Sequence, residues 1–189
     1  MLFSCAGYVL LPSAPVWANP TGEQVVGGAA TFERAGNTLT VQQATDRLAV
    51  NWQDFSIAAG EHTHFNMPSA ASIALNRVLG GNPSQIYGTL SSNGNIILVN
   101  NAGILVGPGG VVNTASFVGS TLDIDPQQFM NAAAGGYHLH GDSYAPIVNQ
   151  GSITAEKGDV FLIAQKVENR GLTSAPNGRA GLVRSEEHT

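Results

Sequence analysis

Asn149-Gln-Gly-Ser-Ile-Thr-Ala155 recurs twenty residues later as Asn169-Arg-Gly-Leu-Thr-Ser-Ala175, and Gly158-Asp-Val-Phe-Leu-Ile163 recurs at the same shift as Gly178-Arg-Ala-Gly-Leu-Val183. Six positions of this repeat agree in identity or type. A period of about twenty residues is too short for a pair of helices, and the units show no helical periodicity. The repeat therefore predicts a β-solenoid, in which each coil holds two or three short strands joined by Gly, Asn and Ser corners.

Apolar and polar residues alternate upstream of this repeat, as they do in half-buried strands. The alternation is clear in residues 39–41, 48–52 and 73–75, so we expect Ile73 and Leu75 to point into the coil. At about twenty residues per coil, roughly 165 residues predict about eight coils and a rod about 40 Å long. Because the first coil has an open edge, we expect residues 21–37 to form a cap over it.

The composition favours one ordered domain and excludes a class of partner. The chain has 189 residues, of which 43% are hydrophobic and only 11% are charged. The net charge is −5 with only 8 Lys and Arg residues, whereas nucleic-acid binding requires clustered cations. We therefore expect no nucleic acid among the partners.

Residues 1–18 are apolar and end in Val-Trp-Ala, which is typical of a signal peptidase site, so we expect a signal peptide that ends at Ala18. A basic segment is missing at its start, which indicates a signal truncated at that end. A buried N-terminal strand is the alternative. The only cysteine, Cys5, lies in this segment. At the other end, residues 184–189 abandon the repeat, and we expect them to be a non-native tail.

Four stretches in a fixed order carry a family resemblance: residues 51–57 (NWQDFSI), 74–90 (ALNRVLGGNPSQIYGTL), 93–110 (NGNIILVNNAGILVGPGG) and 111–124 (VVNTASFVGSTLDI). Together they resemble the haemagglutination-activity, or TPS, domain of filamentous haemagglutinin-type two-partner secretion exoproteins. The resemblance covers nearly the whole chain after the expected signal peptide.

This resemblance implies an all-β fold, a right-handed parallel β-helix with an N-terminal cap and extra-helical excursions, over residues 19–183. It implies an N-terminal secretion domain of an adhesin from a Gram-negative bacterium, which passes through the periplasm and is secreted or displayed at the cell surface. The implied partner is an outer-membrane transporter that recognises the domain through periplasmic POTRA domains, after which the domain nucleates β-helix folding at the surface. A host or surface ligand would be bound by a downstream region. No enzymatic activity and no cofactor is implied.

The resemblance also points to candidate residues for transporter recognition. The family loop usually reads Val-Asn-Pro-Asn-Gly-Ile, and here residues 99–104 read Val-Asn-Asn-Ala-Gly-Ile. Asn82-Pro83 is expected to form a turn. Asn76 and Arg77 are interpreted either as a corner asparagine and a cation that caps coil carbonyls, or as part of the transporter contact. The full set of candidates is Asn76, Arg77, Asn82, Pro83, Asn100, Asn101, Gly103 and Ile104.

Two other chemistries deserve comparison with this interpretation. His62-Thr-His64 and His138-Leu-His140 have the spacing of metal ligands on a strand, with Glu61 or Asp142 as a third ligand, but solvent-facing histidines are favoured and no metal is expected. A carbohydrate-active β-helix enzyme would need paired carboxylates. The acids are instead scattered, at Asp54, Asp123, Asp125, Asp142 and Asp159.

The export portion of a contact-dependent toxin is a further alternative, because it would differ only downstream. Residues 125–148 interrupt the repeat, and we expect them to form a short helix and a hairpin packed on the side of the rod.

Overall fold

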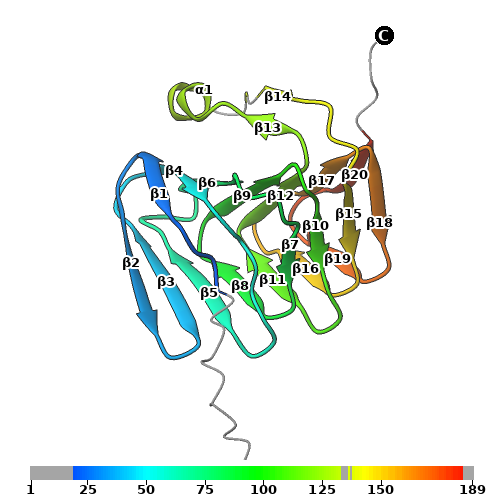
Figure 1. Ribbon diagram of the computed structural model, residues 1–189, viewed down its shortest axis with the longest axis horizontal. Coiled ribbons are helices and arrows are strands. Elements are labelled where there is room, and N and C mark those ends of the chain that lie inside the picture. The colour runs from blue at the N-terminus through cyan, green and yellow to red at the C-terminus, as the bar shows by residue number, and fades with distance from the viewer. Residues whose placement is uncertain (1–18, 133–135, 137, 185–189) are drawn as a thin grey trace, which may run out of the picture.

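The computed structural model describes residues 19–132, 136 and 138–184, so the expected signal peptide lies outside the described residues. The described chain winds into a parallel β-helix whose coils stack side by side (Figure 1). Three sheets form its faces. Within the described residues, no helix is long and apolar enough to cross a membrane.

The first sheet has seven strands, and its neighbours after the first pair are all parallel. In spatial order its strands are β1 (Gln24–Gly27), β4 (Arg47–Trp52), β6 (Ile73–Val78), β9 (Asn95–Asn100), β12 (Ser116–Ser120), β17 (Val160–Ala164) and β20 (Ala180–Arg184). Strand β20 extends the solenoid to Arg184, one residue into the segment expected to be a tail.

The second sheet also has seven strands, and the third has four. The second contains β2 (Ala30–Ala35), β3 (Thr38–Gln43), β5 (His62–Asn66), β8 (Thr89–Ser92), β11 (Val111–Thr114), β16 (Ser152–Ala155) and β19 (Leu172–Ser174). The third contains β7 (Ser84–Ile86), β10 (Ile104–Val106), β15 (Pro146–Asn149) and β18 (Lys166–Asn169).

The expected cap is confirmed at the first edge of the solenoid. Strand β1 pairs antiparallel with β4, and β2 pairs antiparallel with β3, whereas the coils that follow pair in parallel. Both capping strands lie within residues 21–37. An antiparallel strand here occupies the hydrogen-bonding groups that an open edge would expose.

The prediction of eight coils is wrong, because the solenoid has about six. Only the last step of the first sheet, from Val160 to Ala180, has the expected length of twenty residues. The earlier coils are longer, and the step from Leu48 to Ala74 takes 26 residues. The step from Phe117 to Val160 takes 43, because the excursion lies within it.

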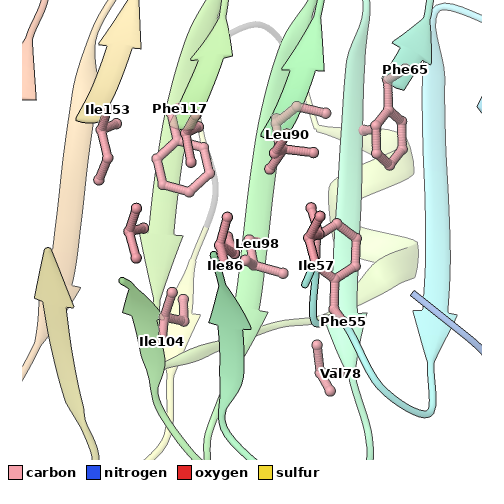
Figure 2. Close-up of a cluster of buried hydrophobic side chains, with 14 of the residues drawn as sticks. Phe55, Ile57, Phe65, Val78, Ile86, Leu90, Leu98, Ile104, Phe117 and Ile153 are labelled. Carbon is pink, nitrogen blue, oxygen red and sulfur yellow. The ribbon is translucent and has the colours of Figure 1, made fainter. Parts of the chain in front are cut away.

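The interior is a column of side chains that stack in register from coil to coil (Figure 2). One column joins Leu90 of β8, Val112 of β11 and Ile153 of β16, all fully buried. Each such side chain contributes about 1.5–3 kcal/mol when it leaves water. The column on the first sheet contains Phe117, which is also fully buried.

The excursion covers part of the outer face of the first sheet, as predicted from residues 125–148, although the solenoid already resumes at Pro146. It contains the helix α1 (Pro126–Asn131) and the antiparallel pair of β13 (Asp123–Ile124) and β14 (Leu139–His140), which lie together above the sheet in Figure 1. Asp125 caps α1 by accepting a hydrogen bond from the backbone N–H of Gln128. Phe129 of α1 is fully buried.

The excursion packs on the first sheet from outside, so this sheet has apolar residues on both of its faces. Ile73 and Leu75 lie on the outer face, in the apolar cluster under the excursion, and Ala74 lies in the inner cluster. The expectation that Ile73 and Leu75 point into the coil is therefore wrong. Since apolar residues cover both faces of this strand, alternation alone does not reveal which side is inside.

Arg77 fixes the excursion to the solenoid. Its Nε and Nη2 donate to the two carboxylate oxygens of Asp123 at 2.8 and 2.6 Å, and its Nη1 donates to Asn51. A second arginine, Arg47, donates to the carbonyl oxygens of Phe129 and Ala132 at the end of α1. Burial, the largest single influence, raises the pKa of Asp123. The hydrogen bonds from Arg77, the backbone N–H of Ile124 and the nearby positive charges together outweigh it and keep that pKa below its usual value.

We predict that Asp123→Asn lowers the free energy of unfolding by about 1–2 kcal/mol at neutral pH, because a partly solvent-screened charged pair is lost. The folded pKa of Asp123 is depressed, so this contribution is complete above its unfolded pKa of about 3.9 and is lost as the pH falls through the folded value. Urea unfolding at a series of pH values measures the difference between wild type and variant. That difference should be constant from neutral pH to about pH 4 and shrink below it.

The exposed Asp142 of the same excursion provides the control, and Asp142→Asn should change stability by less than about 0.5 kcal/mol. Equal effects of the two substitutions would show that Arg77 does not hold the excursion.

Candidate functional site

Asn100 is the centre of the candidate site, because its buried side chain ties two corners of the solenoid together. It ends β9, and its Nδ2 donates to the carbonyl oxygen of Asn82 and to the hydroxyl of Ser84, both at 3.0 Å. Its Oδ1 accepts from the backbone N–H of Ala102 at 2.8 Å. The side chain therefore uses both ends of its amide on neighbouring backbone and hydroxyl groups, as a corner asparagine does.

Gly103 completes this corner. Its φ of +111° lies in the region that favours glycine, and a Cβ there would approach the carbonyl oxygen of Pro146 to 3.0 Å. The backbone N–H of Gly103 donates to the carbonyl of Asn100, and its own carbonyl accepts from the N–H of Ser84, each at 3.0 Å. Ile104 follows as the first residue of β10 and is buried in the core.

Asn101 differs from Asn100 in every respect that matters for the corner. It is exposed, and its backbone carbonyl oxygen accepts a hydrogen bond from the Ser143 hydroxyl at 2.6 Å. Ser143 belongs to the excursion, so the loop and the excursion meet here. The two positions that depart from the usual family loop, Asn101 and Ala102, thus lie on the outer side of a corner made by Asn100 and Gly103.

An apolar groove of about 290 Å³ lies beside this corner, on the outer face of the third sheet. Its walls come from β7, β10 and β15 and from the turns that precede them. They comprise Pro83, Gln85, Ala102, Gly103, Ile104, Leu105, Pro146 and Val148. We call these residues, with the loop at 100–103, the corner groove.

The structure brings six of the eight candidate residues to this region and separates the other two. Pro83, Gly103 and Ile104 line the groove, while Asn82, Asn100 and Asn101 form the adjoining turns. Five residues complete the walls and were not among the candidates: Gln85, Ala102, Leu105, Pro146 and Val148. Their signal is the in-register pairing of β7, β10 and β15, which the sequence repeat shows only for the later coils.

Asn76 is not a corner residue. It lies within β6, is fully buried, and accepts a hydrogen bond from the indole Nε1 of Trp52 at 3.0 Å, while its Nδ2 donates to the carbonyl of Ile97. An amide inside the column is tolerated because it satisfies the indole N–H of a buried tryptophan. Arg77 likewise binds the Asp123 carboxylate rather than capping coil carbonyls.

The scattered acids take part in local structure. Asp54 accepts from the backbone N–H of Ser56, Asp125 caps α1, and Asp159 accepts from the backbone N–H of Arg179. With Asp123 bound to Arg77, four of the five carboxylates considered for an enzyme site hold the fold together. This arrangement does not favour the carbohydrate-active alternative.

The histidines of β5 lie on the second sheet, away from the third. His62 Nε2 and His64 Nδ1 each lie 2.7 Å from the hydroxyl oxygen of Ser91 on β8. Burial lowers the pKa of His64, and the neighbouring His62 lowers it further. Glu61, proposed as a third ligand, instead accepts from the backbone N–H of Ala58.

Comparisons with known proteins agree with the architecture. The family model described as the TPS secretion domain matches residues 17–186. A heme/hemopexin-binding protein of Haemophilus influenzae strain Rd is 33% identical over 163 residues, which cover 84% of this chain and 18% of that protein. A second Haemophilus influenzae protein of the same description is 32% identical over 126 residues, covering 66% of this chain and 13% of its own length. The chain thus spans less than a fifth of these relatives.

Among solved structures, the secretion domain of HMW1 from Haemophilus influenzae superposes with a TM-score of 0.80 at 34% sequence identity. The match covers 88% of this chain and 45% of that one. A similarity at this level extends to the sequence as well as the fold.

We predict that Asn100→Ala lowers the free energy of unfolding by about 2–3 kcal/mol, because it removes the partner of the buried Ser84 hydroxyl and of the half-buried backbone N–H of Ala102. Asn101→Ala should cost less than about 0.5 kcal/mol, since that side chain is exposed. Chemical denaturation of the two purified variants measures both values. Similar losses in the two would contradict the assignment of the corner to Asn100.

Proposed function

Because the chain belongs to the TPS secretion domain family, we propose that it is the export domain of a larger two-partner secretion exoprotein, engaged at the corner groove by its outer-membrane transporter. The observation that supports this proposal is the apolar groove beside a rigid corner. A rigid corner presents a fixed shape to a partner, and an apolar groove supplies most of the binding energy when it is covered.

The corner groove suits an extended or edge segment of a periplasmic POTRA domain. Pro83 and Pro146 stand at two of the strand starts that line the groove. Both prolines add apolar surface to its walls. Leu105 and Val148 lie side by side in register on its floor and are half-buried. A partner side chain laid across them would remove apolar surface from water.

The departure from the usual family loop falls on the surface of this corner. Asn100 and Gly103, which carry the corner hydrogen bonds, match the family loop, and the exposed Asn101 does not. We therefore expect the corner to form as in the family, while Asn101 and Ala102 select among transporters. The partner would be the transporter encoded for this exoprotein rather than any member of its class.

We propose a secreted or surface-displayed adhesin of a Gram-negative bacterium, whose ligand is bound outside the secretion domain. The signal peptide of residues 1–18 would direct the chain to the periplasm, where the transporter binds it. An export portion of a contact-dependent toxin would use the same groove and differ only in the region downstream.

Secretion measured with and without the cognate transporter tests the proposal. We predict that Leu105→Arg lowers the released fraction about tenfold, equal to about 1.4 kcal/mol of lost docking energy, because a charge then lies on the floor of the groove. Thr154→Arg is the matched control, since Thr154 is also half-buried and lies on an outer face, but on the second sheet. It should be released like the wild type.

Binding to purified POTRA domains separates a docking defect from a folding defect. Leu105→Arg should retain the wild-type circular dichroism spectrum and lose binding. Equal release of Leu105→Arg and wild type, or release without any transporter, would overturn the proposal.

A further inference from the structure

His62 and His64 lie on the outer face of the second sheet, where they stand next to one another on β5. Strand alternation directs both imidazoles outward and the intervening Thr63 inward, where its hydroxyl donates to Asn19. The two rings are half-buried, and their centroids lie 5.8 Å apart. They are therefore held by the sheet and still reachable from solvent.

The two imidazoles point at a common place. His62 Nε2 and His64 Nδ1 are each 2.7 Å from the Ser91 hydroxyl oxygen, so the two nitrogens are separated by no more than twice that distance. The Ser91 hydroxyl donates its single proton to one of these nitrogens and accepts an N–H from the other. The ring planes are inclined by 54°, so two lone pairs converge there once each imidazole carries its proton on the opposite ring nitrogen. Ser91 is in register with His64 on the adjacent strand β8, so stacking of the coils fixes this arrangement.

The second histidine pair lacks this convergence. The rings of His138 and His140 are nearly parallel, at 14°, with centroids 6.5 Å apart. Nitrogen lone pairs in parallel planes do not meet at one point. Both residues are also exposed, whereas His62 and His64 are half-buried.

Few charged side chains surround His62 and His64, and imidazole binds metal ions through an unprotonated ring nitrogen. The neighbouring strands β3 (TLTVQQ) and β8 (TLSS) contain no charged residue. Glu33 faces the same row from β2, but it lies two strands from His64. Burial and the proximity of His62 also keep the pKa of His64 below its ordinary value.

We propose that His62 and His64 chelate one borderline divalent transition-metal ion, Cu²⁺, Ni²⁺ or Zn²⁺, above strands β5 and β8. Imidazole nitrogen is the ligand that these ions share, at about 2.0–2.1 Å for zinc. The Ser91 hydroxyl turns aside to admit the ion, and water fills the remaining positions. Among the described residues, no group of three His, Cys, Asp or Glu residues could enclose an ion, so this is an open site that exchanges its metal.

Isothermal titration calorimetry of the tag-free full chain with each of the three chlorides measures the binding. We expect one strong site per chain, with copper bound most tightly. His62→Gln and His64→Gln should each weaken it by more than about tenfold, since even outer-shell partners of a metal contribute that much. The double variant His138→Gln/His140→Gln is the matched control and should bind like the wild type.

Nitrogen-15 spectra of the histidine rings with zinc identify the donor atoms. We expect the largest shifts at His62 Nε2 and His64 Nδ1. Binding that survives in the His62→Gln/His64→Gln double variant, or is lost in the control, would overturn the proposal. Absence of binding for all three ions by a wild type that retains its circular dichroism spectrum would also overturn it.

Discussion

The in-register stacking of parallel strands is the constraint on which the rest of the structure depends. Each inward position faces its counterparts in the coils before and after it, as Leu90, Val112 and Ile153 do. Burying a polar group in such an interior costs free energy unless the group finds a hydrogen-bond partner. Asn76 and Asn100 are buried because each finds its partner in a neighbouring coil, the first at Trp52 and the second at Ser84.

The sequence predicts this architecture where a coil closes without interruption. The twenty-residue repeat of the last coils gives the solenoid, and the capping strands fall where an open edge requires them. The twenty-residue period does not predict the number of coils, because longer turns and the excursion lengthen the early coils. The sequence also does not show that the Ile73 side chain points outward. Residues of α1 and β14 pack on the outer face, so both faces of β6 carry apolar residues.

The candidate site was predictable to the extent that it consists of corner residues. The resemblance to the family loop points to Asn100 and Gly103, and the structure gives each a specific task. The walls of the groove could not be inferred in the same way, since Gln85, Leu105 and Val148 are separated in sequence and meet only through register. The sequence suggests a corner or a transporter contact for Asn76 and Arg77, whereas in the structure Trp52 and Asp123 supply partners from distant segments.

The three faces of the solenoid thus have different surfaces, and this division bears on the proposed export role. The excursion covers part of the first face, the second face carries polar side chains and the histidine pair, and the third presents the corner groove. Coils stack along the axis, and the edge formed by the last described strands exposes Leu182, whose register partner Leu162 in the preceding coil is buried. The corner groove lies on the side of the solenoid and not at its end, so a partner docked there approaches perpendicular to the axis. A transporter bound there would leave that edge free, so recognition and coil addition need not compete for the same surface.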